Sequence, residues 1–193
     1  GKTVGIIGTG STAVQAIPVI AKEAKHLTVF QRTANYSIPA KNRALMSGEV
    51  EEIKSRYPDI RTEARSNRAG IASMKPGMDS AMSVSESERI EEYQRRWDEG
   101  GTGFTAAYSD IGINDASNFT AAEFVREKIR ETVLNSKTAE LLAPTNTIGC
   151  KRLCADTDYY ETYNRDNVTL LDVNVDPIKG LVEEGIQTEN NVY

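Results

Sequence analysis

The stretch GKTVGIIGTGSTAVQ (Gly1–Gln15) decides the fold of this chain. Val4 to Ile7 is a short apolar run between glycines, which is typical of a buried β-strand. The letters GTGSTA follow at Gly8–Ala13, and apolar residues then recur at helical spacing from Val14 onward. The order of strand, glycine turn and helix predicts the opening of a dinucleotide-binding unit.

The glycine turn carries the chemistry of this prediction. Gly8 permits a tight turn after the strand, and Gly10 lets the backbone approach a pyrophosphate group. Ala13 occupies the third small-residue position, where the helix packs against the strand. The free N–H groups at the start of the helix would then face the phosphates. The alternative is a glycine-rich strand-to-helix turn that holds no ligand.

The second predicted strand, HLTVFQR (His26–Arg32), bears on which dinucleotide is bound. NAD-binding units usually place Asp or Glu at the end of this strand, where the carboxylate holds the ribose hydroxyls. Here the residues are Gln31, Arg32 and Thr33, and none of them is a carboxylate. A permanent guanidinium and a hydroxyl suit a 2′-phosphate, so Arg32 and Thr33 predict NADP(H) over NAD(H). The alternative is that Arg32 is a solvated surface residue.

The sequence contains a near copy of the glycine turn. GTGFTA (Gly101–Ala106) follows the polar helix end RRWDEGG (Arg95–Gly101) and not an apolar strand. We therefore predict a flexible loop at this second site, and not a phosphate site.

The middle of the chain has a helical pattern. Ser85 and Glu88 form a predicted capping box, and Thr120 and Glu123 form another ahead of Phe124. We predict an α/β fold: a Rossmann-like dinucleotide-binding domain made of residues 1–41 and 144–193. Residues 42–143 are a large helical insertion in it.

The last part of the chain predicts a strand and a hairpin. NVTLLDV (Asn167–Val173) is the strand, and DPIKGLVEEGIQT (Asp176–Thr188) predicts a hairpin with its turn near Glu183 to Gly185. A dinucleotide fold would normally return to its sheet with one more central strand. We therefore expect a truncated domain, cut from a longer polypeptide.

Composition limits the partners. The chain has 193 residues and a formal net charge of -5, which gives no basic footprint and argues against nucleic acid. Its apolar runs are shorter than the roughly 18 residues of a membrane span, so we expect no membrane partner. Two cysteines without a recognisable signal peptide suggest a reducing cytosol, and hence a cytoplasmic location.

The stretch IGCKRLCADTDYYETYNRDNV (Ile148–Val168) holds both cysteines. Cys150 and Cys154 would need two further ligands to hold zinc, and the chain offers one distant histidine, so we predict no metal site. A redox pair is a second reading, and packed thiols are the reading we favour. We expect Tyr159 and Tyr160 to pack this segment onto the sheet.

At this point the residues resemble a known family, the flavin-dependent Baeyer–Villiger monooxygenases, such as cyclohexanone, phenylacetone and steroid monooxygenases. The resemblance spans almost the whole chain and is weakest between about residues 45 and 100. The most specific part is GCKRLCADTDYYETYNRDNVTLLDV, residues 149–173. The other parts are GKTVGIIGTGSTAVQ, HLTVFQRTANYSIPA and FTAAEFVREKIRETV.

The resemblance implies roles for further residues. It places Lys151 beside Arg32 and Thr33 at the 2′-phosphate, and it makes Arg152 the catalytic arginine. Ordinary surface charges at Lys151 and Arg152 are the alternative. The residues that it places along the pyrophosphate and ribose are Thr9, Ser11, Thr12 and Gln15.

The resemblance also implies an activity for the parent protein. Such enzymes use FAD, NADPH and O2 to convert ketones into esters or lactones. This chain resembles their NADP domain and lacks the FAD domain, so we expect no FAD and no turnover in the isolated chain. The alternatives are a flavoprotein monooxygenase that oxidises sulfur or nitrogen, and a non-catalytic NADP-binding module.

Overall fold

The computed structural model describes residues 1–67, 69–72 and 74–193. The β-strands, in chain order, are β1 (Thr3–Ile7), β2 (His26–Gln31), β3 (Ser37–Pro39), β4 (Cys154–Asp156), β5 (Val168–Asp172), β6 (Ile178–Val182) and β7 (Gly185–Thr188). The helices are α1 (Ser11–Glu23), α2 (Glu49–Ser55), α3 (Tyr57–Ser66), α4 (Glu86–Glu99), α5 (Asp115–Thr132), α6 (Ser136–Leu142) and α7 (Tyr159–Thr162). A short 3-10 helix, η1, spans Thr102–Ala106.

The central element is β2, which lies in a parallel sheet of order β1-β2-β5. Ile7 pairs with Phe30, and Gln31 pairs with Asp172, so the carboxyl ends of the three strands meet at one edge. The predicted order of strand, turn, helix and strand is confirmed, and so is the α/β class. This edge is where open parallel sheets bind their ligands.

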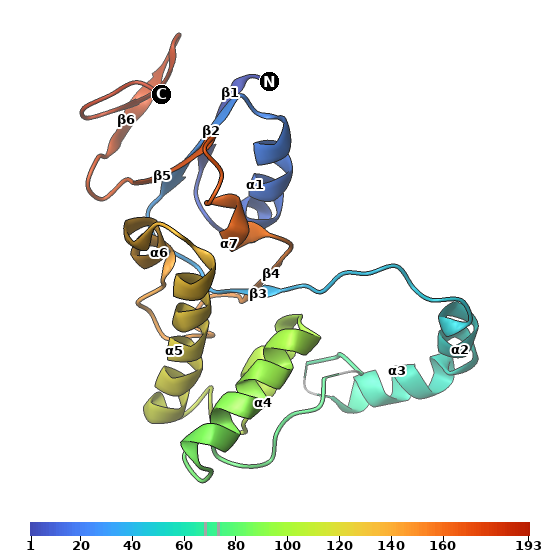
Figure 1. The fold of residues 1–193 in the computed structure, drawn as a ribbon. Coiled ribbons are helices and arrows are strands. Elements are labelled where there is room, and N and C mark those ends of the chain that lie inside the picture. The colour runs from blue at the N-terminus through green and yellow to red at the C-terminus, as the bar shows by residue number, and fades with distance from the viewer. Residues whose placement is uncertain (68, 73) are drawn as a thin grey trace.

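Helix α1 covers one face of this sheet, and α7 lies beside α1 (Figure 1). Pro18 lies inside α1 and is buried, and the helix continues past it to Glu23. At this carboxyl-terminal end of the helix, Asn167 Nδ2 donates to the carbonyl oxygens of Ala21 and Ala24, at 2.9 and 3.0 Å. These bonds join the end of α1 to the turn that precedes β5.

A second parallel pair, β3 with β4, has no counterpart in the sequence predictions. Ser37 pairs with Cys154 and Pro39 with Asp156. Each strand has only three residues, which is too short for an alternation pattern to be recognised. The pair fixes the segment that carries Lys151 and Arg152 beside the chain that leaves β2.

The helical part is built on a cluster of aromatic side chains. The capping box at Ser85 and Glu88 is confirmed, and it begins α4. The centroids of the Tyr93 and Phe104 rings lie 5.5 Å apart, and those of Phe104 and Phe124 lie 5.8 Å apart. This packing holds α4, η1 and α5 together.

Two predictions in this part are wrong. The helix α5 begins at Asp115 with Asn114 as its N-cap, and Thr120 lies within it, where its Oγ1 donates to the carbonyl of Ser117. GTGFTA is not a flexible loop but the 3-10 helix η1, because Phe104 is fully buried in the aromatic cluster. Tertiary packing overrides the local turn signal here.

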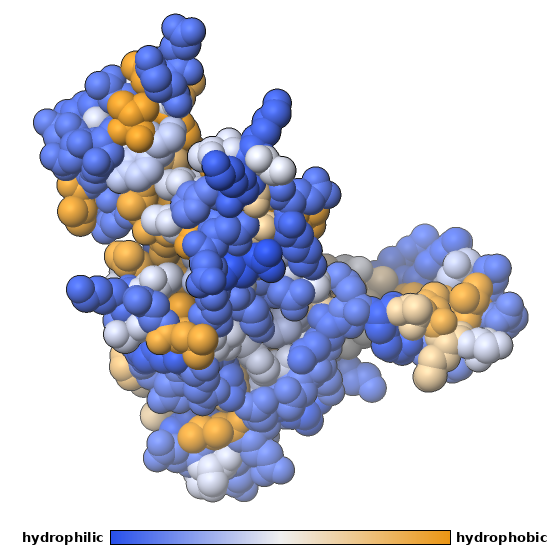
Figure 2. Space-filling model, turned by 45° about the horizontal axis from the view of Figure 1, so that its top comes forward, coloured by the Kyte–Doolittle hydropathy of each residue, from blue (hydrophilic) through white to orange (hydrophobic). Residues whose placement is uncertain are grey.

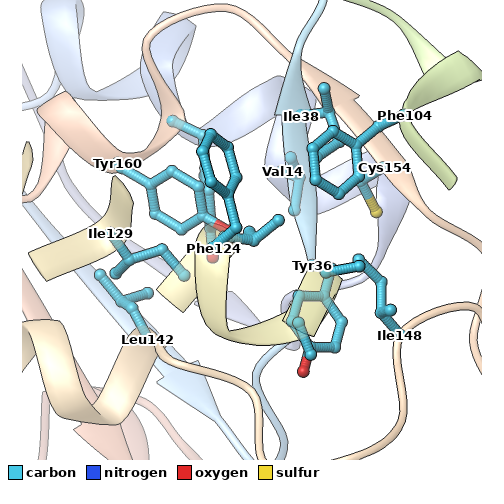
Figure 3. Close-up of a cluster of buried hydrophobic side chains, with 14 of the residues drawn as sticks. Val14, Tyr36, Ile38, Phe104, Phe124, Ile129, Leu142, Ile148, Cys154 and Tyr160 are labelled. Atoms are coloured by element: carbon cyan, nitrogen blue, oxygen red, sulfur yellow. The ribbon is translucent and has the colours of Figure 1, made fainter. Parts of the chain in front are cut away.

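One hydrophobic core joins the sheet to the helices. Val14 of α1 and Cys154 of β4 belong to the same cluster of buried side chains as Phe124 and Ile129 of α5 (Figure 3). The division of the chain into a dinucleotide-binding domain (residues 1–41 and 144–193) and an insertion (residues 42–143) stays a prediction. The two parts share one core and are not separated by packing.

The remaining segments lie at the edges. The predicted hairpin is confirmed as β6 with β7, and Tyr193 after it packs edge-on against Phe30, with ring centroids 5.6 Å apart. Helices α2 and α3 have no buried residues and extend away from the rest (Figure 1), and Figure 2 shows apolar atoms on the surface of that lobe. Among the described residues, no helix is both long and apolar enough to cross a membrane.

Candidate functional site

The glycine turn lies at the carboxyl end of β1. Gly8 has a φ of +97°, which favours glycine, and its N–H donates to the carbonyl of Phe30 at 2.8 Å. Gly10 is the N-cap of α1 and has an extended backbone, with φ -81° and ψ -179°. A Cβ at Gly8 or Gly10 would meet no atom within 4 Å, so open space lies in front of both residues. The start of α1, where a helix favours a bound anion, is therefore open.

A cavity of about 430 Å³ opens in front of this turn. It is formed at the carboxyl ends of β1, β2 and β5 together with the loop before β4. Its lining residues are Ile7, Gly8, Thr9, Gly10, Phe30, Arg32, Thr33, Asn35, Lys151 and Val173. The structure thus brings together six of the predicted site residues, from three separate segments of the chain.

Arg32 and Lys151 supply the positive charge of this cavity. Both side chains are exposed, and both line the cavity with Thr33. They come from segments more than a hundred residues apart in the sequence. Two cations in one cavity attract a ligand with clustered negative charge, such as a phosphate group.

Thr9 has a structural contact of its own. Its side chain is buried, and Oγ1 donates to the carbonyl of Thr33 at 3.0 Å. The hydroxyl therefore joins the glycine turn to the loop that carries Arg32 and Thr33.

The other predicted residues of the turn lie outside the cavity lining. Ser11 Oγ lies 3.3 Å from Cys154 Sγ, and Gln15 Nε2 donates to the carbonyl of Ala155 at 3.3 Å. Thr12 is exposed, and Ala13 packs against the core, which is the contact that the motif predicts for its third small residue. The side chains of Ser11 and Gln15 thus join α1 to β4. Contact of these turn residues with a ligand stays a prediction.

Arg152 and the preceding Lys151 differ in their relation to the cavity. It is exposed, like Lys151, but it does not line the cavity. Successive residues before β4 thus face different surroundings. The catalytic role of Arg152 stays a prediction.

The two cysteines also differ. Cys154 is buried and lies 3.1 Å from Asn35 Nδ2, whereas Cys150 is exposed, and both are free thiols. The predicted packing of the thiols is therefore confirmed for Cys154 and is wrong for Cys150. In the described part of the chain, no group of three or more His, Cys, Asp or Glu residues is placed to hold a metal ion.

Asp156, the last residue of β4, anchors the β3–β4 pair. Its carboxylate accepts hydrogen bonds from Ser37 Oγ and from the N–H of Tyr159. Burial raises the pKa of Asp156 above its ordinary value, and these hydrogen bonds oppose the shift. Tyr159 and Tyr160 are buried here, which confirms their predicted packing role.

Sequence reasoning missed several cavity residues, of which Asn35 is the most informative. Asn35 lies in the same loop as Arg32 and joins the cavity to Cys154. Asn35 lies three residues after Arg32, and the dinucleotide-binding motif specifies no residue at this position, so no pattern in the sequence selects it. Phe30 and Val173 line the cavity because the register of the sheet brings the ends of β2 and β5 to the same edge. The sequence alone does not reveal this register.

The fold and the cavity define the class of this chain: a Rossmann-like α/β unit with a glycine turn and two cations at the carboxyl edge of its sheet. No family model matches the chain. Among curated proteins, it is 43% identical over 195 residues to a phenazine N-monooxygenase of Lysobacter antibioticus. It is 42% identical over 196 residues to a cyclohexanone 1,2-monooxygenase of Acinetobacter sp.. Each match covers 100% of this chain and 36% of the relative.

Solved structures agree with these matches. A steroid monooxygenase bound to NADP superposes with a TM-score of 0.95 at 47% identity, over 100% of this chain and 37% of that one. An open structure of cyclohexanone monooxygenase gives 0.94 at 39% identity, over 100% and 38%. A further relative, 39% identical over 192 residues, is named a Baeyer–Villiger monooxygenase, from Pseudooceanicola batsensis. The chain is homologous to a segment of these monooxygenases, which confirms the resemblance, and it spans about a third of their length.

Proposed function

We propose that the chain is the NADP(H)-binding portion of an FAD- and NADPH-dependent Baeyer–Villiger monooxygenase that converts ketones to esters or lactones with O2. The cavity carries this proposal, because it unites the glycine turn with Arg32, Thr33 and Lys151. The relatives support it, since a homologous steroid monooxygenase is described as bound to NADP.

The charge of the cofactor fits the cavity. A 2′-phosphate carries roughly -1.5 to -2 charges near neutral pH, so two cations can share it. Arg32 and Lys151 line the same space as Thr33, whose hydroxyl can donate to a phosphate oxygen. The pyrophosphate would lie against Gly8 and Gly10, where there is room for it.

The remaining roles come from the family. Ser11, Thr12 and Gln15 would lie along the pyrophosphate and ribose. Arg152 would contact the reacting atoms, because a guanidinium stabilises an anion without losing its proton. When bound, FAD supplies the oxygen chemistry.

Binding of the reduced cofactor tests the proposal on the chain itself. Calorimetric titration should show tighter binding of NADPH than of NADH, with weak absolute affinity in the isolated chain. Equal affinities would reject the assignment to NADP(H). A purified chain with stoichiometric flavin would contradict the expectation that it binds no FAD.

The activity is tested in the full-length protein. Ketone-dependent consumption of NADPH, with an ester or lactone as product, is the expected result. In the same protein, Arg152→Ala should leave reduction of the flavin largely intact and abolish oxygenation. Normal ester formation by that variant in stopped-flow measurements would refute the role of Arg152.

A second candidate function is oxidation of nitrogen or sulfur by the same kind of flavoprotein. It is favoured by one observation, the 43% identity to a relative named phenazine N-monooxygenase. An N-oxide or sulfoxide as the sole product would support it. A third candidate, a non-catalytic NADP-binding module, would be supported if the native reading frame encoded no FAD domain. We also propose that the protein acts in the cytoplasm, which fractionation of the native cells would test.

A further inference from the structure

The loop after β2 has a feature that the cofactor motif does not explain. Arg32 and Thr33 lie outside regular secondary structure, yet both line the cavity. The direction of their side chains therefore depends on how the main chain of residues 31–33 is held. Each carbonyl oxygen of these residues accepts a hydrogen bond from a different donor.

The three donors come from two neighbouring segments. The N–H of Val173 donates to the carbonyl of Gln31 at 2.9 Å, which extends the ladder between β2 and β5 by one bond. Thr9 Oγ1, from the glycine turn, donates to the carbonyl of Thr33 at 3.0 Å. Between them, Asn174 Nδ2 donates to the carbonyl of Arg32 at 2.7 Å.

Asn174 is itself held in place by the end of β5. Asp172 Oδ1 accepts a hydrogen bond from the N–H of Asn174 at 2.9 Å and another from its Nδ2 at 2.7 Å. The Asp172 side chain therefore closes a turn that directs the Asn174 amide toward Arg32. Asn174 does not line the cavity, so any effect that it has on a ligand is indirect and acts through Arg32.

We propose that Asn174 is a positioning residue that sets the preference for a 2′-phosphorylated cofactor by fixing the main chain of Arg32. The inference rests on the proposed cofactor assignment and extends it to a residue outside the binding motif. Loss of the Asn174 amide frees the carbonyl of Arg32, and the guanidinium then spends less time over the phosphate. A hydrogen bond of this kind contributes about 0.5–1.5 kcal/mol, which corresponds to roughly a twofold to tenfold change in affinity.

The test uses two probes that differ only in the 2′-phosphate, 2′,5′-ADP and 5′-AMP, titrated into the 193-residue chain by NMR. Asn174→Ala should weaken 2′,5′-ADP by roughly twofold to tenfold and leave 5′-AMP unchanged. Asn190→Ala is the matched control, because Asn190 is also exposed and its Nδ2 donates to the carboxylate of Asp176 and not to the carbonyl of Arg32. This control should change neither affinity.

A double-mutant cycle separates positioning from general damage. In an Arg32→Ala background, Asn174→Ala should have no further effect on 2′,5′-ADP, because the side chain that it positions is gone. An equal loss for both probes, additive effects in the cycle, or no difference from Asn190→Ala would overturn the inference. Failure of the unmodified chain to prefer 2′,5′-ADP would instead reject the cofactor assignment, and the inference with it.

Discussion

Two hexapeptides of this chain, GTGSTA (Gly8–Ala13) and GTGFTA (Gly101–Ala106), differ only at Ser11 and Phe104, yet they form different structures. The first leaves a parallel strand and begins the 13-residue helix α1 at the open edge of the sheet. The second leaves α4 and forms a 3-10 helix whose Phe104 is buried among aromatic rings. The comparison teaches that the element before a glycine motif, and the packing of one side chain, decide what the motif becomes.

The cations near the two hexapeptides differ as well. The second hexapeptide borders a cavity of about 670 Å³ that Arg95 and Arg96 also line. Both arginines form ion pairs with Glu92, with distances of 2.7 and 2.8 Å. At the first hexapeptide, Arg32 lines the cavity and appears in no ion pair of the described residues. The two arginines of the second cavity are therefore partly neutralised by a carboxylate, whereas Arg32 of the first cavity is not.

The largest expected effect comes from making the two hexapeptides identical. Phe104→Ser should lower the free energy of unfolding by about 3–5 kcal/mol, because it removes a fully buried ring and leaves a cavity. Urea unfolding followed by circular dichroism measures this. The control Ser11→Ala removes only a hydroxyl contact to Cys154 and should cost about 1 kcal/mol or less. A similar loss in both variants would break the comparison.

Next in size is the difference between the two sets of cations. Arg32→Ala should weaken NADPH roughly 10- to 100-fold and leave NADH nearly unchanged, because a bond to a charged group contributes about 1.5–3 kcal/mol. Arg95→Ala, at the second hexapeptide, should leave both affinities unchanged. Calorimetry with both cofactors checks this. Loss of NADPH binding in Arg95→Ala would show that the wrong cavity had been assigned.

The second glycines of the hexapeptides give a smaller effect on binding. Gly10 has a backbone that alanine also adopts, and its added Cβ would meet no protein atom, so Gly10→Ala should fold normally. That Cβ would instead lie where the pyrophosphate approaches, and NADPH binding should weaken by about tenfold, or roughly 1.4 kcal/mol. Gly103 likewise has open space, and Gly103→Ala should alter neither stability nor binding. Unchanged binding in Gly10→Ala would argue for a turn without a ligand.

The smallest expected effect is on the pH dependence of stability. Because burial raises the pKa of Asp156, the folded chain holds a proton that the unfolded chain loses above about pH 3.9. Stability should therefore fall as the pH rises above this value, up to the raised pKa of Asp156. Asp156→Asn should remove this part of the pH dependence, as measured by urea unfolding at a series of pH values.

Asp110, four residues after η1, should affect the pH dependence of stability in the opposite direction to Asp156. Burial raises its pKa, but hydrogen bonds from Ser80 Oγ, the Ala81 N–H and Ser117 Oγ outweigh burial, and the net shift is downward. Its contribution to stability is therefore present above the ordinary pKa of aspartate and is lost as the pH falls toward its lowered pKa. Asp110→Asn should flatten the acid side of the profile. The same sign in both variants would contradict the assigned environments.

Much of the fold could be predicted because its signals are local. The apolar run Val4–Ile7, the capping box at Ser85 and the hairpin turn near Glu183 each depend on neighbouring residues, and all three were found. The start of α5 was misplaced, because Asn114 and Thr120 both resemble N-caps and only the packing of the first turn distinguishes them.

The candidate site was predictable only in parts. The spacing of the glycines indicated Gly8 and Gly10, and the residue types after β2 indicated Arg32 and Thr33. Lys151 came from a family resemblance, since no periodicity connects it to the turn. Asn35 and Asn174 were missed, because each acts through a contact between segments distant in sequence.

The sequence by itself determined the order of strand, turn and helix, since those signals reside in residue types a few positions apart. It also determined which side chains carry charge. Only the tertiary structure decided that Lys151 shares a cavity with Arg32 while Arg152 does not, and that GTGFTA is a buried 3-10 helix. The physical reason is that strand register and core packing are set by contacts between distant segments, which no local pattern encodes.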